Sequence, residues 1–342
     1  MAQPLSSLAN KVTGKITEPC GLKQIIGHHE IKERLFQAQK HGRLPSTFLL
    51  VGPDGVGRKK LALALAQSLV CEVPVSQREL GGCGSCGPCL RIAKAQSEAL
   101  LLIAPEKNTI KIEQTSRVLE FLSLQAISKA RVIIIDSAHL MNPTAANTLL
   151  KILEEPPADC YFFLIAPGPQ HVLPTLRSRA QVVRFSGLSL EEMKTKSTAA
   201  EWALRACQGS FSRLAGFQDP DELETRDFAG RFLEMWLSDR RAFMTPEWKN
   251  MIKDRVGALS LTRYVGLLLR DAIISKVVLA SSAKEIQKNS QIINADKIDL
   301  ILKLTSLELS LLQKMSQNIF RLEGALHANR DTQLSFEEFW LS

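Results

Sequence analysis

Short, continuous apolar segments alternate with amphipathic ones through the first half of the chain. Because the apolar segments lack strict alternation, we expect strands that are buried on both faces. Such strands, separated by helices, are typical of a parallel α/β sheet. The expected strands are one that begins at Phe48, then Ala99–Ile103, Arg131–Asp136, Tyr161–Ile165 and Gln181–Phe185.

The segments between these strands carry apolar stripes at helical spacing. The best marked helix begins at Asn142 and Pro143, a cap and a first-turn residue, and stops before Pro156 and Pro157. The other expected helices are a short one around Ile31, Leu35 and Ala38, one that carries Leu61, Leu65 and Leu69, and Glu113–Leu124. Residues 1–187 are therefore predicted to form one parallel α/β core.

Beyond Gly187 the strand pattern ends and the chain becomes helical. We expect a small helical domain over residues 188–220 and a larger all-helical domain over residues 221–342. Apolar stripes of this kind are typical of the core of a helical bundle. One stripe predicts a single long helix with Leu300, Leu304, Leu307, Leu311 and Met315, continuing past Ile319 and Leu322, and another predicts a helix with Val265, Leu268, Leu269, Ala272 and Ile273.

Composition and charge narrow the class of protein. The 342 residues are 45% hydrophobic and 23% charged, which is typical of a globular chain and excludes a disordered one. The apolar runs are too short to span a bilayer, and Met1–Asn10 lacks an export signal, so we expect a cytoplasmic protein without a membrane anchor. The net charge of +8 suits a nucleic-acid or acidic partner, although a generally basic surface fits it equally well.

A glycine-rich turn follows the strand at Phe48 and precedes a helix, which is the layout of a phosphate-binding loop. Such a loop reads G-x-x-x-x-G-K-[ST], because its lysine reaches the phosphates and its hydroxyl binds Mg²⁺. Gly52 and Gly57 have this spacing, with Gly55 between them, but Arg58 replaces the lysine and Lys59 the hydroxyl residue. The alternative is a chance glycine-rich turn, which the flanking strand and helix disfavour. The substitutions argue against ATP chemistry here, and weak nucleotide binding stays open.

A second element of an ATPase site stands at the end of the strand VIIID. Asp136 occupies the place where a P-loop ATPase holds Mg²⁺. In hydrolysing members of the additional-strand class the next residue is an acid that activates water, whereas this chain has Ser137. A serine cannot serve as that base. The alternative is an ordinary strand that ends in an aspartate.

Four cysteines follow the helix after the glycine-rich turn. Cys71, Cys83, Cys86 and Cys89 offer four thiolates, a ligand set typical of a closed, structural zinc site. An iron–sulfur cluster would need a cysteine at Ala93, and metal-free thiols are the third alternative. We expect structural zinc.

With these motifs and the segments LLKILEEPP (Leu149–Pro157) and LRSRA (Leu176–Ala180), the chain resembles the AAA+ clamp-loader family of bacterial DNA polymerase III. The resemblance is strong over residues 20–187 and weaker through the helical part. It implies an AAA+ core (1–187) with an inserted zinc module (71–89), a small helical lid (188–220) and a collar (221–342) that assembles into a pentameric ring. Motor members of the family keep the G-K-T loop and the D-E pair, so this chain is similar to the stationary delta-prime type, which does not hydrolyse ATP.

The resemblance also implies functional residues. LRSRA matches the Ser-Arg-Cys motif of the family, with Ala180 in place of the cysteine, and the motif's arginine reaches ATP on a neighbouring subunit. Arg179 is therefore the candidate arginine finger, acting in trans, with Arg177 as the second candidate. A surface salt bridge is the alternative role for Arg179.

Two further positions correspond to the family's sensor residues, the first of which binds the γ-phosphate of ATP. The first sensor falls at Ala166 or Pro167, whose side chains cannot bind a γ-phosphate. Arg213 lies one residue later than the motor pattern places the second sensor. We expect no ATPase activity of the chain's own.

The function implied is that of a subunit of the DNA-directed DNA polymerase III holoenzyme in DNA replication. Its expected partners are gamma/tau-type motor subunits and the delta subunit, in a hetero-oligomer, with the sliding clamp and primed DNA. One alternative is an active motor-type ATPase in which Arg58 and Lys59 act in place of the usual lysine and hydroxyl residue. The other is a zinc-ribbon DNA-binding protein with a vestigial ATPase core.

Overall fold

The chain folds into two compact units, Met1–Glu192 and Met193–Ser342. This computed structural model describes residues 21–94, 96–125, 128–239, 245–278, 286, 289, 291–328 and 330–341. For residues 339–341 it describes the backbone alone. Residues 1–20 of the predicted core lie outside the described residues. The finer division of the helical part at residue 221 stays a prediction.

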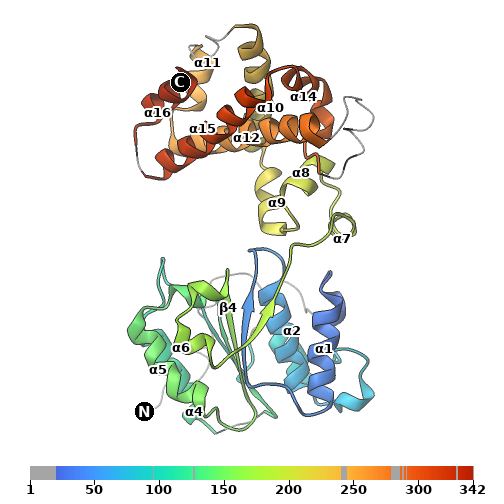
Figure 1. Cartoon of the computed structure of the whole chain (residues 1–342). Helices are drawn as coiled ribbons and strands as arrows, with labels where there is room; N and C mark the ends of the chain where they lie inside the picture. Colours follow the sequence, from blue (N-terminus) through green and yellow to red (C-terminus); the bar gives the residue numbers. More distant parts are fainter. Residues whose placement is uncertain are drawn as a thin grey trace. The chain divides into compact units, whose positions relative to one another are not determined.

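The first unit contains a five-stranded parallel sheet whose strand order is β2-β3-β4-β1-β5 (Figure 1). All five predicted strands are present. β4 is inserted between β1 and β3, which is the additional-strand arrangement that the resemblance implies. The carboxyl ends of β1, β3 and β4 therefore meet at one edge of the sheet. The strands are β1 (Thr47–Val51), β2 (Leu100–Ile103), β3 (Arg131–Ile135), β4 (Cys160–Ala166) and β5 (Gln181–Arg184).

Helices pack on both faces of this sheet. Leu50 and Phe163 belong to a core that includes residues of α1 and α2, whereas Leu49 and Phe162 belong to a second core with residues of α5. Neighbouring residues of one strand thus face opposite cores, which explains the continuous apolar runs. The helices are α1 (His29–Lys40), α2 (Arg58–Val70), α3 (Gly87–Ala93), α4 (Ile112–Ser123), α5 (Pro143–Glu154) and α6 (Pro174–Arg177).

The ends of α5 are as predicted. The Asn142 side chain accepts a hydrogen bond of 2.7 Å from the Ala145 backbone N–H, and Pro143 is the first helical residue. The helix ends at Glu154, two residues before Pro156. This C-terminus places the Glu154 carboxylate at the surface of the first unit, where a candidate site residue meets it.

The described residues of the second unit form helices only. The longest, α12, packs against α10, α14 and α15. α7 crosses the boundary between the units. The helices are α7 (Leu190–Lys194), α8 (Glu201–Ala206), α9 (Phe211–Phe217), α10 (Pro220–Ser238), α11 (Pro246–Met251), α12 (Arg255–Val278), α14 (Ile298–Thr305), α15 (Leu309–His327) and α16 (Thr332–Leu341).

The prediction of one continuous helix through Leu300 and Leu322 is wrong, because the chain breaks between α14 and α15. Thr305 and Ser306 donate their hydroxyls to carbonyls three residues earlier, at 2.7 and 2.6 Å. Such bonds compete with the backbone pattern of a helix. Lys276 of α12 then donates to the carbonyls of Thr305 (2.7 Å) and Leu307 (2.6 Å) and satisfies the broken end.

A fully buried carboxylate stabilises the second unit. Asp271 of α12 accepts hydrogen bonds from the backbone N–H groups of Ile293 (3.1 Å) and Asn294 (2.7 Å) and from the Asn294 side chain (2.9 Å). Arg270 adds a contact of 2.9 Å. Several donors are needed to offset the cost of burying such a charge. Asp271 therefore fixes the segment before α14 against α12.

An arginine in the same region lies on an aromatic ring. The guanidinium of Arg226 lies 3.8 Å from the ring centroid of Trp202 on α8. It also donates to both carboxylate oxygens of Asp296, at 2.7 and 2.9 Å. The stacking and the ion pair together fix α8 to α10 and to the segment before α14.

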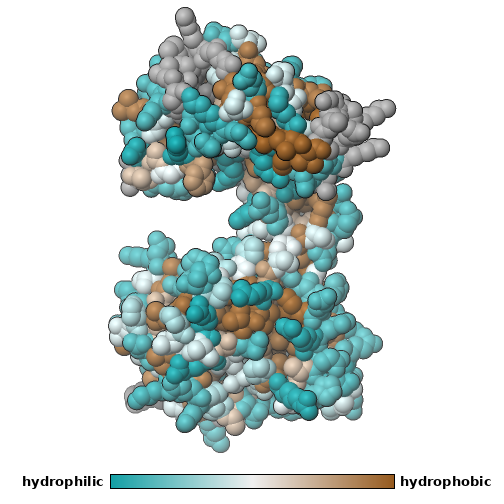
Figure 2. Space-filling view, in the orientation of Figure 1, coloured by the Kyte–Doolittle hydropathy of each residue, from teal (hydrophilic) through white to brown (hydrophobic). Residues whose placement is uncertain are grey.

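No described helix has both the length and the apolar surface that crossing a bilayer requires. Hydrophilic residues cover much of the face of each unit drawn in Figure 2.

Candidate functional site

The glycine-rich turn follows a path that only glycine adopts readily. It joins β1 to α2, and Gly52, Gly55 and Gly57 have φ values of 151°, 74° and 102°, which side-chain-bearing residues rarely adopt. A Cβ atom on Gly52 would lie 2.5 Å from the carbonyl oxygen of Phe185. The path of the loop therefore favours glycine at these three positions, and its role as a phosphate-binding loop stays a prediction.

Arg58 does not extend from this loop. Its side chain is only 7% exposed, and the guanidinium donates to the Asp54 carboxylate and to the Ala166 carbonyl at the end of β4. Both terminal nitrogens therefore bind oxygens of the same chain. Asp54 was missed by the sequence analysis, although its spacing of four residues from Arg58 is a signal for an ion pair.

Lys59 binds Asp136, the acid that directly follows β3. Its Nζ lies 3.0 Å from Oδ2 of Asp136, and the two side chains are 30% and 27% exposed. The structure thus brings together the loop and the strand end that the sequence singled out separately. The Lys59 ammonium therefore neutralises the Asp136 carboxylate at this edge of the sheet. Ser137, the next residue, has a φ of 57° and begins a turn.

Two histidines border the loop. Nε2 of His28 lies 3.0 Å from the Val56 carbonyl within the loop, and burial lowers the pKa of His28. Burial also lowers the pKa of His139, and the nearby His171 adds to this effect. Neutral imidazoles are therefore favoured around this site. The sequence offered no signal that would place His28 at the loop.

Arg179, the candidate finger, follows α6. One terminal nitrogen donates to the Glu154 carboxylate, and the other donates to the Thr175 carbonyl at 2.8 Å and to Ser178 Oγ at 3.3 Å. The side chain is 30% exposed. Arg177, the second candidate, is exposed. Glu154 belongs to the segment that carries the resemblance, but the sequence did not pair it with Arg179.

Arg213 lies in the second unit. It is on α9, and its guanidinium donates to the Gln208 side chain at 3.0 Å. Its role as a second sensor stays a prediction.

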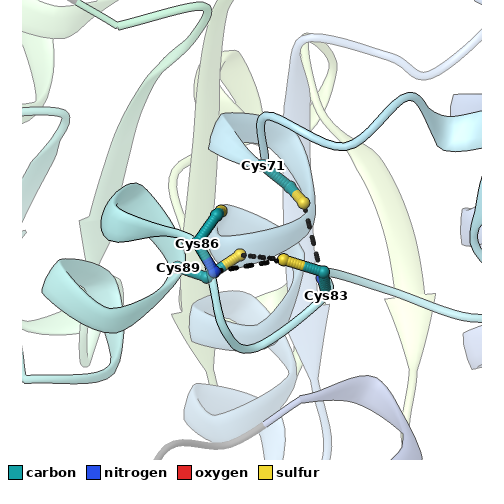
Figure 3. A group of neighbouring side chains, drawn as sticks. All are labelled: Cys71, Cys83, Cys86 and Cys89. Carbon is teal, nitrogen blue, oxygen red and sulfur yellow. Dashed lines mark hydrogen bonds between the residues drawn. The ribbon is translucent and has the colours of Figure 1, made fainter.

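The four cysteines converge at the end of α2 (Figure 3). Cys71 follows the last residue of α2, Cys86 caps α3, and Cys89 lies within α3. Their sulfur atoms all lie within 4.8 Å of one another. Gly84, with a φ of 76°, allows the turn between Cys83 and Cys86, and the Cys86 N–H donates to the Cys83 sulfur at 3.3 Å.

The thiols differ in their electrostatic surroundings. Burial raises the pKa of Cys71 and of Cys89. Burial acts in the same direction on Cys83, but hydrogen bonds from the backbone N–H groups of Cys86 and Ser85 outweigh it and lower the pKa of Cys83 to about 6. Buried thiolates need a cation to offset their desolvation.

The size of the cluster fits one tetrahedral metal ion. Zinc–sulfur bonds of 2.3 Å place neighbouring sulfurs about 3.8 Å apart. The Cys83 and Cys89 sulfurs are 3.9 Å apart. Four sulfur ligands leave no open position for substrate, so a metal held here would be structural.

Comparisons with known proteins give matches to subunits of DNA polymerase III. Residues 27–189 match the protein family described as "DNA polymerase III, delta subunit". The chain is 35% identical over 153 residues to the DNA polymerase III subunit delta' of Escherichia coli K12, a match covering 44% of this chain and 45% of that protein. It is 35% identical over 135 residues to the delta' subunit of Pseudomonas aeruginosa, covering 39% and 40% of the two chains.

More distant proteins also match. The gamma/tau subunit of Mycobacterium tuberculosis H37Rv is 31% identical over 176 residues, covering 52% of this chain and 30% of that protein. A solved gamma subunit-related protein of Thermotoga maritima is 15% identical with a TM-score of 0.42, covering 90% of this chain and 97% of that chain.

The chain thus spans less than half the length of the delta' relatives that it matches. The matched region contains the parallel core, the glycine-rich loop, the cysteine cluster and Arg179, and an all-α unit follows it. Over residues 27–189, the chain is thus similar to the delta' subunits of DNA polymerase III.

Proposed function

We propose that this chain is a non-hydrolysing, delta-prime-like subunit of the DNA polymerase III clamp loader. In this role Arg179 reaches ATP that is bound to a neighbouring motor subunit. The observation that carries the first part is the Lys59–Asp136 ion pair of 3.0 Å, which places a cation of the chain itself at the acid that would hold Mg²⁺.

The surroundings of this pair support the absence of ATPase activity. Arg58 is bound to Asp54 and to the Ala166 carbonyl, so a phosphate would have to displace both contacts. Ser137 cannot act as the base that activates water. Hydrolysis needs the metal, the cation and the base together, and each of them is replaced here.

The trans role of Arg179 rests on its chemistry and its place in LRSRA. A guanidinium on a γ-phosphate stabilises the charge that develops during phosphoryl transfer. Arg179 follows a short helix at the surface of the first unit and keeps part of its side chain exposed. An arginine buried among its own helices could not reach a neighbouring subunit.

The proposed partners are gamma/tau-type motor subunits, the delta subunit, the sliding clamp and primed DNA, in the cytoplasm. The four cysteines would hold a structural zinc ion. The metal would join the end of α2 to α3 and so support the helix that begins at the glycine-rich loop.

The test is ATP turnover by motor subunits of the same organism, with clamp and primed DNA, titrated with this chain. We expect no turnover by the chain alone, stimulation by the wild type, and loss of stimulation at the completed site with Arg179→Ala. Arg177→Ala tests the second candidate, and Arg34→Ala, which removes an exposed arginine of α1, is the control. Assembly of each variant is checked by size-exclusion chromatography.

Two results would contradict the proposal. ATP hydrolysis by the chain alone would favour a motor-type ATPase. Full stimulation by Arg179→Ala would show that Arg179 is not the arginine finger. Tight, steeply salt-dependent DNA binding by the chain without partners would instead favour a DNA-binding protein with a vestigial core.

A further inference from the structure

We propose that Glu154 is a positioning residue for Arg179, which it holds against the chain's own surface until a phosphate on a neighbouring subunit displaces it. This inference rests on the proposed trans role of Arg179. It adds a residue that sets how readily the guanidinium becomes available.

The geometry of the free chain supports this role. Glu154 is the last residue of α5, and Arg179 follows α6. Leu153 of α5 and Leu176 of α6 share one hydrophobic core, so the backbones that carry the pair are fixed next to each other. With Glu154 on one terminal nitrogen and Thr175 and Ser178 on the other, the guanidinium points to its own chain.

A phosphate could readily replace the Glu154 carboxylate on the Arg179 guanidinium. The side chains of Glu154 and Arg179 are 47% and 30% exposed, and ion pairs that are open to water are weak. Nε of Arg179 is buried without a hydrogen-bond partner, so the arrangement leaves one donor unsatisfied. A phosphate offers more charge and several acceptor oxygens to the same guanidinium.

The two anions compete for one cation. A carboxylate beside a triphosphate is repelled, so Glu154 opposes the approach of Arg179 to the phosphate. In the free chain the same carboxylate lowers the affinity of the guanidinium for other phosphates, including those of nucleic acid. Removing its charge should therefore make Arg179 more available.

The first measurement uses the free chain and does not depend on the motor. Phenylglyoxal, which modifies arginine side chains, is allowed to react with wild type, Glu154→Gln and Glu155→Gln, and the rate at Arg179 is followed by mass spectrometry. Glu155 is the matched control, because it is the neighbouring exposed glutamate. We expect Glu154→Gln to raise the rate roughly two- to fivefold, the range for a weak ion pair, and Glu155→Gln to leave it unchanged.

The second measurement is the turnover titration with motor subunits, clamp and primed DNA. Glu154→Gln should reach half-maximal stimulation at a chain concentration roughly two- to fivefold lower, with the same maximum, whereas Glu155→Gln should match wild type. The double variant Glu154→Gln with Arg179→Ala should behave like Arg179→Ala, because Glu154 acts through Arg179.

The outcomes separate the two proposals. If Arg179→Ala loses stimulation while Glu154→Gln matches Glu155→Gln in both assays, the finger stands and the role of Glu154 is overturned. A loss of stimulation with Glu154→Gln would also overturn it, since Glu154 would then support the finger. If Glu154→Gln raises the modification rate but Arg179→Ala stimulates fully, the trans role of Arg179 is overturned. The Glu154–Arg179 ion pair is then a feature of the free chain only.

Discussion

The ammonium group of Lys59 and the carboxylate of Asp136 lie 3.0 Å apart at the edge of the sheet where the glycine-rich loop meets β3. A working loop would direct a hydroxyl and a metal ion to this place. Under the proposed function, the Lys59 ammonium stands in for that metal ion. The competition between Lys59 and Mg²⁺ for Asp136 can be measured.

Restoring the loop sequence should restore nucleotide binding. The double variant Arg58→Lys with Lys59→Thr frees Asp136 and supplies the lysine and hydroxyl that a nucleotide and Mg²⁺ require. We expect its affinity for Mg·ATP to exceed that of wild type by about tenfold or more, the effect of about 1.4 kcal/mol. The measurement is isothermal titration calorimetry.

The same variant should still fail to hydrolyse ATP, because Ser137 is unchanged. Wild-type binding as tight as that of the double variant would show that Lys59 and Arg58 do not obstruct the loop.

Zinc should bind with a stoichiometry of one ion per chain and hold the end of α2 to α3. Native mass spectrometry should detect this ion in the wild type and not in Cys83→Ser. Chelation should increase amide hydrogen exchange at the ends of α2 and α3, while exchange in α5 stays unchanged as an internal control. Visible absorption typical of an iron–sulfur cluster in the purified chain would contradict zinc.

The stability of the first unit should depend on pH through His28. Burial lowers the pKa of His28 below its ordinary value of 6.5, so below that pH the unfolded chain binds a proton that the folded chain resists. The stabilisation is fully present above pH 6.5 and is lost as the pH falls toward the lowered pKa. Glu192 acts against this shift, whereas Lys32 and His29 add to it.

The measurement is hydrogen exchange in the first unit at pH 7 and 5.5, corrected for the intrinsic effect of pH. His28→Gln keeps a nitrogen donor for the Val56 carbonyl but does not titrate, so its loss of protection at pH 5.5 should be smaller. Part of the dependence should remain, because the pKa of His139 is lowered too. An equal loss in variant and wild type would exclude His28 as a contributor.

Removing the buried carboxylate of α12 should destabilise the second unit strongly. Asp271→Ala leaves the backbone donors of Ile293 and Asn294 without their acceptor. We expect a loss of about 3 kcal/mol or more in the free energy of unfolding, measured by exchange of the most protected amides of α10 and α12. Glu323→Ala removes an exposed carboxylate from α15 and should change stability by less than about 0.5 kcal/mol.

Local patterns were sufficient to predict much of the fold. The five strands were predicted because each places apolar side chains in both cores, as Leu49 and Leu50 show. Asn142 marked the start of α5 because capping depends on residues only three positions away. The helix break at Ser306 was missed, since the apolar stripe continues through it and the stabilising lysine comes from α12.

The candidate site was predicted in its parts but not in its pairings. The sequence identified Lys59, Asp136 and Arg179, because each occupies a position in a motif. The partner of Arg179 is Glu154, which lies on another helix, and only the folded sheet and its packed helices bring the two together. Which acid meets which base therefore depends on tertiary structure, which local spacing does not encode.

Trp202, whose ring lies under Arg226, is one of several tryptophans whose positions have an optical consequence. All four tryptophans of the chain, at positions 202, 236, 248 and 340, belong to the second unit, whereas the four clustered cysteines belong to the first. Intrinsic tryptophan fluorescence therefore reports on the helical unit, and thiolate-to-cobalt absorption in a cobalt-substituted chain would report on the α/β unit. One cobalt-substituted sample, without any attached dye, can thus show in two spectra when each unit unfolds.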